Sequence, residues 1–207
     1  GIMTGLATLV AEEMDADWSR FEVELAPADT PVFLNTHLGR QGTFASTGIA
    51  NSWIQMRRVG AGARAMLVAA AAARWDVPAD EISVSRGIVR HGSSDRQASF
   101  GELAEQAMAQ PAPDPETLEL KPAEAWSRIG RDALRVDAPA KIAGTATFAL
   151  DVRRPGMVRA LVARPPRFGG TVRGFDAGAA LDVPGVLEVV EIPSGVAVLA
   201  EDTWAAM

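Results

Sequence analysis

The chain of 207 residues contains no cysteine. Disulfides, thiolate-bound iron–sulfur clusters and cysteine-based zinc sites are therefore excluded within it, and any redox cofactor must be held by other groups. Histidine is scarce as well, with two residues in the whole chain. His37 has no second histidine or carboxylate at the spacing of a metal site, so we expect no metal ligands in this sequence.

The chain also lacks an excess of positive charge and any long apolar run. Its 20 basic and 26 acidic residues give a net charge of −6, with no basic patch to offset it. This balance argues against nucleic acid or an anionic membrane as the main partner. The longest apolar run, Ala65–Ala73, is mostly alanine and too short to cross a bilayer. We expect neither a nucleic-acid nor a membrane partner.

Periodicity in the first half of the chain predicts an α+β unit. Apolar residues at helical spacing predict a helix over residues 3–15 and a long helix that ends near Trp75. Alternation of apolar and charged residues predicts a strand over 20–25 and a strand pair over 82–84 and 87–90. Ser99, with Glu102 three residues later, has the pattern of a capping box that opens a short helix to Met108.

The second half has a different composition. Residues 110–115 contain three prolines, which favour an extended linker, and we place a linker at 111–126 between units at 1–110 and 127–207. Beyond it, segments rich in Val, Thr and Phe alternate with turns and predict a small β-rich α+β module. The expected strands are 142–152, 157–163, 171–175, 187–192 and 196–199, with a short helix from Asp176 to Leu181.

The junction between a loop and the long helix is the clearest functional signal. Residues 42–48 are rich in Gly, Thr and Ser and run directly into that helix. Because a helix start leaves backbone N–H groups unpaired at the positive end of its dipole, such a loop is suited to hold an anion such as a phosphate or a pterin cofactor. The alternative is that Ser46 or Thr47 only caps the helix. The preceding segment 28–41 is long for a connection, which also suggests function.

Three other patterns have simpler structural explanations. The sequence Gly60-Ala61-Gly62-Ala63 lacks the strand and third glycine of a dinucleotide fingerprint, so we expect it to serve close helix packing. The polar residues His91, Ser93, Ser94 and Asp95 are too near in sequence to act as a triad and predict a hairpin tip. The acidic residues Glu12, Glu13, Asp15 and Asp17 are interpreted as a solvated helix end.

Several segments, taken in order, resemble the molybdenum-binding large subunits of the xanthine oxidase and aldehyde oxidase family, in particular the isoquinoline 1-oxidoreductase type. Residues 2–18 match the sequence that follows the family's GQG motif, of which Gly1 would be the last glycine, and 41–58 match its small-residue loop and Trp- and Arg-containing helix. Residues 135–148 resemble the α/β hammerhead domain, as do 163–166, 180–186 and 196–200. The resemblance covers nearly the whole chain.

The resemblance implies a molybdopterin-binding α+β unit followed by an α/β hammerhead domain. It implies a molybdopterin cofactor with molybdenum, in the cytosine dinucleotide form. The residues that it assigns to cofactor binding are Gly1, Thr43, Phe44, Ala45, Ser46, Thr47 and Gly48. Phe44 and Ala45 stand where relatives often have glycine, and Gly48 replaces a position that can be serine.

The chemistry implied by the resemblance is oxidative hydroxylation of an N-heteroaromatic compound or an aldehyde with water, with electrons passed to a small [2Fe-2S] subunit. The family's glutamate base and the glutamine of its motif match no residue here, so we assign no catalytic residue. We expect a fragment that is inactive without the remainder of the large subunit. The alternative is a non-catalytic binding or assembly module. Relatives suggest the periplasm, with the cytoplasm as the alternative.

Overall fold

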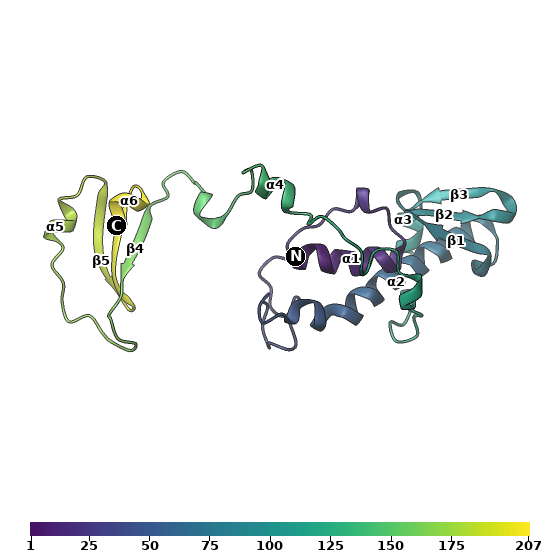
Figure 1. The fold of residues 1–207 in the computed structure, drawn as a ribbon, viewed down its shortest axis with the longest axis horizontal. Helices are drawn as coiled ribbons and strands as arrows, with labels where there is room; N and C mark the ends of the chain where they lie inside the picture. The colour runs from purple at the N-terminus through teal and green to yellow at the C-terminus, as the bar shows by residue number, and fades with distance from the viewer. The chain divides into compact units, whose positions relative to one another are not determined.

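The computed structural model describes residues 1–207, which form two units, Gly1–Gly144 and Thr145–Met207. Each unit combines helices with one three-stranded antiparallel sheet, as Figure 1 shows. The α+β class expected from the sequence is therefore present. No helix combines the length and the apolar character that crossing a bilayer requires.

Two helices form the base of the first unit. Helix α1 (Ile2–Met14) and helix α2 (Thr47–Trp75) lie side by side and run in the same direction (Figure 1). The two backbones lie close together at Gly60, where an added Cβ would lie 2.5 Å from the backbone oxygen of Val10. The packing role expected for the Gly60–Ala63 sequence is thus confirmed at Gly60, because no side chain fits there.

The core of this unit lies between α2 and a meander of short strands. Strands β1 (Ile82–Ser85), β2 (Ile88–His91) and β3 (Arg96–Ser99) pair in the order β1-β2-β3, and helix α3 (Phe100–Met108) follows. The buried side chains between these elements include Leu67, Ala71, Val84, Val89 and Leu103.

The local signals in this region were informative. Ser99 and Glu102 form the expected capping box, and Gly92–Ser94 forms a turn at the expected hairpin tip. Strand β3 was not predicted, because its polar sequence has no apolar alternation and only Ala98 is buried. The strand expected over 20–25 is wrong: a 3-10 turn, Trp18–Arg20, is followed by residues without a partner strand.

The second unit contains the strands β4 (Arg159–Ala163), β5 (Val186–Ile192) and β6 (Gly195–Ala200). Their order is β4-β6-β5, so that β4 and β5 are the edges of the sheet (Figure 1). Two short helices complete it, α5 (Gly178–Leu181) and α6 (Thr203–Ala206). The three expected strands 157–163, 187–192 and 196–199 are thus present.

Two other expected strands do not form. In place of a strand over 142–152, helix α4 (Ala138–Ile142) is followed by a 3-10 turn at Ala149–Asp151. Residues 171–175 form no regular element. Their composition suits strands, but neither segment pairs with a strand of the two sheets, and a strand is stable only when its backbone groups are paired.

The proline-rich segment 111–126 packs against the first unit, whereas the sequence predicted a linker between two units. The two units divide after Gly144, rather than at 111–126. Residues of that segment line a cavity with α2 and bond to α1, with a 3-10 turn at Ala123–Ala125. Prolines make the segment extended, as expected, and buried carboxylates of α1 hold it against the first unit.

Candidate functional site

The expected cofactor loop leads to a place where two helix starts lie together. An added Cβ at Gly48 would lie 2.7 Å from the Ile2 side chain, and one at Gly5 would lie 2.7 Å from Ile49. The N-terminal turns of α1 and α2 are therefore in direct contact. The N-cap residue of α1, Gly1, has no side chain, the side chain of the α2 N-cap residue Ser46 makes no cap bond, and neither first turn contains an acidic residue. Two positive helix ends thus lie side by side with no acidic residue in the first turn of either helix.

The backbone at the start of α2 has an unusual conformation. Ala45 and Ser46 are consecutive residues with φ of 53° and 55°, in the left-handed region that non-glycine residues seldom adopt. The hydroxyl of Thr47 donates to the carbonyl oxygen of Phe44 at 3.0 Å and accepts from the Asn35 amide at 3.1 Å. The capping alternative is wrong for both residues, since the Ser46 side chain makes no cap bond and the Thr47 hydroxyl bonds elsewhere.

Side-chain amides fasten the irregular segment 28–41 to this helix start. The Asn51 carbonyl oxygen, on α2, accepts from the backbone N–H and the hydroxyl of Thr36, at 3.0 and 2.6 Å, and lies 3.0 Å from Nδ1 of His37. The Gln41 side chain accepts from the backbone N–H of Asp29 and donates to the carbonyl of Pro27. The segment is thus held in place next to the proposed cradle.

The seven residues expected to bind cofactor do not line one cavity. Thr43 and Gly48 line a cavity of about 220 Å³ that Asn35 and Asn51 also border. Gly1 lines a different one, of about 520 Å³, between α1, the start of α2 and residues 127–135. The described cavities include none of Phe44, Ala45, Ser46 or Thr47. The Arg40 guanidinium lies over the Phe44 ring, 4.9 Å from its centre.

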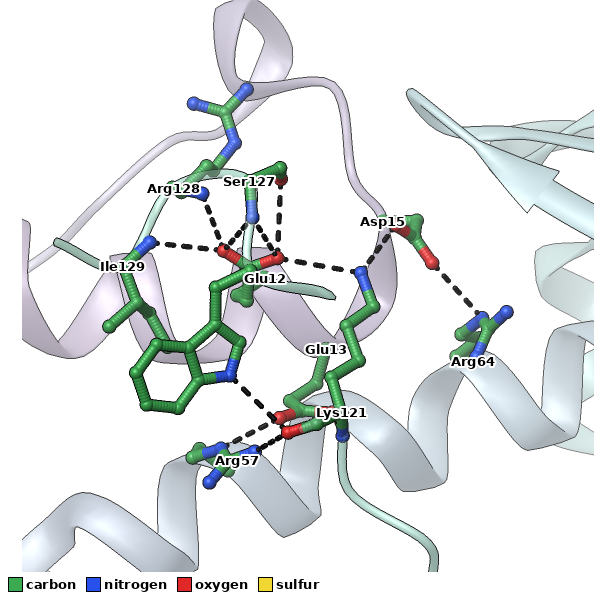
Figure 2. A network of polar contacts seen from close by, with 10 residues as sticks. Glu12, Glu13, Asp15, Arg57, Arg64, Lys121, Ser127, Arg128 and Ile129 are labelled. Atoms are coloured by element: carbon green, nitrogen blue, oxygen red, sulfur yellow. Dashed lines mark hydrogen bonds and ion pairs between the residues drawn. The ribbon is translucent and has the colours of Figure 1, made fainter. Parts of the chain in front are cut away.

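Sequence reasoning missed a second polar centre, at the other end of α1. Figure 2 shows Glu12 and Glu13 pointing toward residues 121–129, which we call the strap. The two glutamates are 1% and 2% exposed, so the expected solvated helix end is wrong for both. A signal was present, because Glu13 follows Leu9 at helical spacing on the apolar stripe of α1.

Glu12 is bound by a row of backbone N–H groups. Ser127, Arg128 and Ile129 donate to its carboxylate at 3.0, 2.6 and 3.0 Å, and the Ser127 hydroxyl donates at 3.2 Å (Figure 2). Burial alone would raise the pKa of Glu12. The three backbone hydrogen bonds and the nearby Lys121 charge outweigh burial and hold that pKa below its usual value. Glu12 is therefore a buried anion in a complementary backbone cradle.

Glu13 connects the strap to α2. Its carboxylate accepts from Nε of Arg57 at 2.7 Å and from the backbone N–H of Lys121 at 3.0 Å. Arg57 in turn donates to the carbonyl oxygen of Lys121 at 2.6 Å. The Lys121 ammonium pairs with Asp15 at 2.5 Å, and Asp15 also pairs with Arg64 at 3.3 Å (Figure 2). Every carboxylate here has a partner within the fold, which makes the network a structural one.

The remaining candidates have structural partners too. His91 is buried, with its ring nitrogens 2.7 Å from the Ser94 hydroxyl and 2.8 Å from the Glu81 carboxylate. No group of three or more His, Asp and Glu side chains has the arrangement of metal ligands.

Comparison with known proteins finds relatives that are much longer than this chain. No protein-family model matches the sequence. It is 37% identical to the beta subunit of isoquinoline 1-oxidoreductase from Brevundimonas diminuta, across 99% of the chain and 30% of that protein. It is 33% identical to a subunit of nicotinate dehydrogenase from Pseudomonas putida, across 97% of the chain and 17% of that protein.

The name of a third relative includes a cofactor, pyrroloquinoline quinone, which differs from the molybdopterin expected from the sequence. The chain is 32% identical to the membrane-bound, pyrroloquinoline-quinone aldehyde dehydrogenase of Gluconacetobacter polyoxogenes, across 100% of the chain and 27% of that protein. The chain thus spans less than a third of the length of these relatives. Since the matches extend over 97–100% of the chain, the chain is homologous to one segment of each of these much longer proteins, among them the beta subunit of isoquinoline 1-oxidoreductase.

Proposed function

We propose that the chain is part of a molybdenum hydroxylase large subunit and that its first unit supplies one wall of the molybdopterin site. The observation that carries this proposal is the contact between the starts of α1 and α2, with no cap bond from the Ser46 side chain and no acidic residue in either first turn. Their unpaired N–H groups and dipoles favour a bound anion. The phosphate of the molybdopterin cofactor is such an anion. We propose that the cofactor is in the cytosine dinucleotide form.

The residues at the two helix starts offer hydrogen-bond donors that suit the phosphate of the cofactor. The backbone of residues 46–48 and the hydroxyls of Thr43 and Ser46 would hold it, with Gly1 on the neighbouring helix start. Thr43 and Ser46 are exposed and their hydroxyls make no hydrogen bond within the structure, which leaves the hydroxyls available to a ligand. Where relatives have a glycine, Phe44 places a ring next to the proposed pterin site. This ring is 45% exposed, so it can move aside to make room for the pterin.

When bound, the cofactor supplies the redox centre for hydroxylating an N-heteroaromatic compound or an aldehyde with oxygen from water. The chain's own contribution is binding and orientation: the amides of Asn35 and Asn51 fix the loop beside the helix starts. The catalytic base, a small [2Fe-2S] partner and the rest of the large subunit are proposed to lie outside these residues. The second unit is proposed to be the α/β hammerhead domain.

The test uses the complete large subunit, matured with its partner subunit, and the variants Ser46→Asp and Ser46→Asn. Both side chains tolerate the left-handed backbone of residue 46 and have nearly the same shape. Only aspartate places a negative charge at the helix start, where it competes with a bound anion. We expect molybdenum content and released pterin fluorescence to fall about tenfold in Ser46→Asp, and to stay near the parent value in Ser46→Asn.

Other outcomes would overturn the proposal. Equal molybdenum content in both variants would show that the cofactor does not bind at this helix start. A fully matured subunit that contains pyrroloquinoline quinone and no molybdenum would favour the cofactor named for the Gluconacetobacter relative. A subunit with neither group would favour the alternative of a non-catalytic assembly module.

A further inference from the structure

Charge is strongly segregated in the second unit. Residues 152–175 contain six arginines and no acidic residue, whereas residues 176–207 contain six acidic residues and no lysine or arginine. Strand β4 lies in the basic segment and β5 in the acidic one, at opposite edges of the sheet (Figure 1). The sheet therefore has a basic edge and an acidic edge.

The arginines of the basic segment have no carboxylate partners. None of the six forms an ion pair with Asp or Glu in the structure. Two of them converge: the guanidiniums of Arg153 and Arg159 donate to the same carbonyl oxygen, that of Val152, at 3.0 and 3.5 Å. Two neighbouring positive charges without a counter-charge repel each other, and a nearby carboxylate would relieve that repulsion.

The same edge is open to a further strand. Strand β4 pairs with β6 on one side only, so the backbone groups on its other side have no strand partner. Apolar side chains are exposed on and beside it, including Met157, Val158, Leu161 and Phe168. Arg, Phe and Met are enriched in protein interfaces, from which Lys, Asp and Glu are depleted. An open, apolar edge is also a template for strand addition.

From these features we propose that the free edge of β4 binds an acidic β-strand supplied by the remainder of the same large subunit. Carboxylates of that strand would pair with Arg153 and Arg159 while its backbone extends the sheet. The proposal rests on the proposed function, because a subunit of the relatives' size has further segments beyond those matched by this chain. A protein strand suits the edge better than nucleic acid or a membrane, since neither can pair with its backbone.

A first experiment tests the chemistry of the edge with the 207-residue chain. The probe is a fluorescent peptide of about eight residues that alternates threonine and glutamate, with a threonine–lysine peptide for comparison. We expect the acidic peptide alone to bind, to protect β4 amides from hydrogen exchange, and to bind about tenfold more weakly when NaCl is raised to about 0.5 M. The double variant Arg153→Glu/Arg159→Glu should abolish binding.

The matched control is Arg90→Glu. Arg90 is also an exposed arginine without an ion pair, but it lies on β2, which has partners on both sides. Its replacement should leave peptide binding unchanged. Native exchange rates of β5 and β6 amides in the double variant check that its sheet still forms, and Arg153→Gln/Arg159→Gln should weaken binding without reversing charge. Equal binding of acidic and basic peptides would overturn the proposal.

A second experiment identifies the source of the strand. We expect β4 amides to exchange slowly in the complete large subunit, even without its partner, and rapidly in the 207-residue chain. Protection that arises only when the partner subunit, nucleic acid or anionic vesicles are added would overturn the assignment to the same subunit. Molybdenum content enters neither experiment, so this proposal and the proposed function fail separately.

Discussion

The carboxylate of Glu12, a residue that is 1% exposed, accepts hydrogen bonds from three backbone N–H groups. In Glu12→Gln, half of the side-chain terminus becomes an NH₂ group, which opposes those donors. We expect the free energy of unfolding of the first unit to fall by about 3 kcal/mol, measured by urea denaturation. Glu105→Gln is the control, because Glu105 lies exposed on α3 and should change stability by less than about 0.5 kcal/mol.

The same carboxyl predicts how stability depends on pH. Its pKa is lower in the fold than its ordinary value of 4.5. It therefore contributes fully above that value, and its contribution is lost as the pH falls through the lower pKa of the folded state. Unfolding midpoints measured between neutral pH and strongly acidic pH should fall more steeply in the parent chain than in Glu12→Gln. Parallel curves would contradict this role for Glu12.

Two glycines on helix α2 allow the effect of packing on stability to be distinguished from the effect of helix propensity. A Cβ at Gly60 would lie 2.5 Å from the backbone oxygen of Val10, whereas one at Gly62 would make an ordinary contact of 3.5 Å with Leu118. Gly60→Ala should therefore destabilise the α1–α2 pair by about 1–3 kcal/mol. Gly62→Ala should be neutral or stabilise the fold by up to about 1 kcal/mol. Thermal unfolding of both variants, which differ by one methyl group from the parent, checks this pair.

Elements with a local signal were predictable, and those that depend on a distant partner were not. Residues close together in the sequence determine the spacing of apolar side chains in α1, α2, β5 and β6. The same is true of the capping box of α3. The segments 20–25, 142–152 and 171–175 have the composition of strands, but no strand of either sheet pairs with them. The buried state of Glu12 was hidden for the same reason, since its partners lie 115 to 117 residues away.

At the scale of the whole molecule, the division after Gly144 predicts two separable responses. The strap and its glutamates belong to the first unit, so Glu12→Gln should speed hydrogen exchange in α1, α2 and residues 127–129. Amides of β5 and β6, in the second unit, should exchange at their parent rates. Exchange followed by mass spectrometry distinguishes this from a single cooperative structure, in which all of these amides would exchange faster together.

The long reach of the strap also sets an order of events during synthesis. Helix α1 leaves the ribosome before the strap, because the N–H groups that bind Glu12 belong to residues 127–129. At about 5–20 residues per second, these groups follow on the order of ten seconds later. Until then, two glutamates on the inner face of α1 favour a hydrated helix. The strap thus delays completion of the first unit until most of it has been translated.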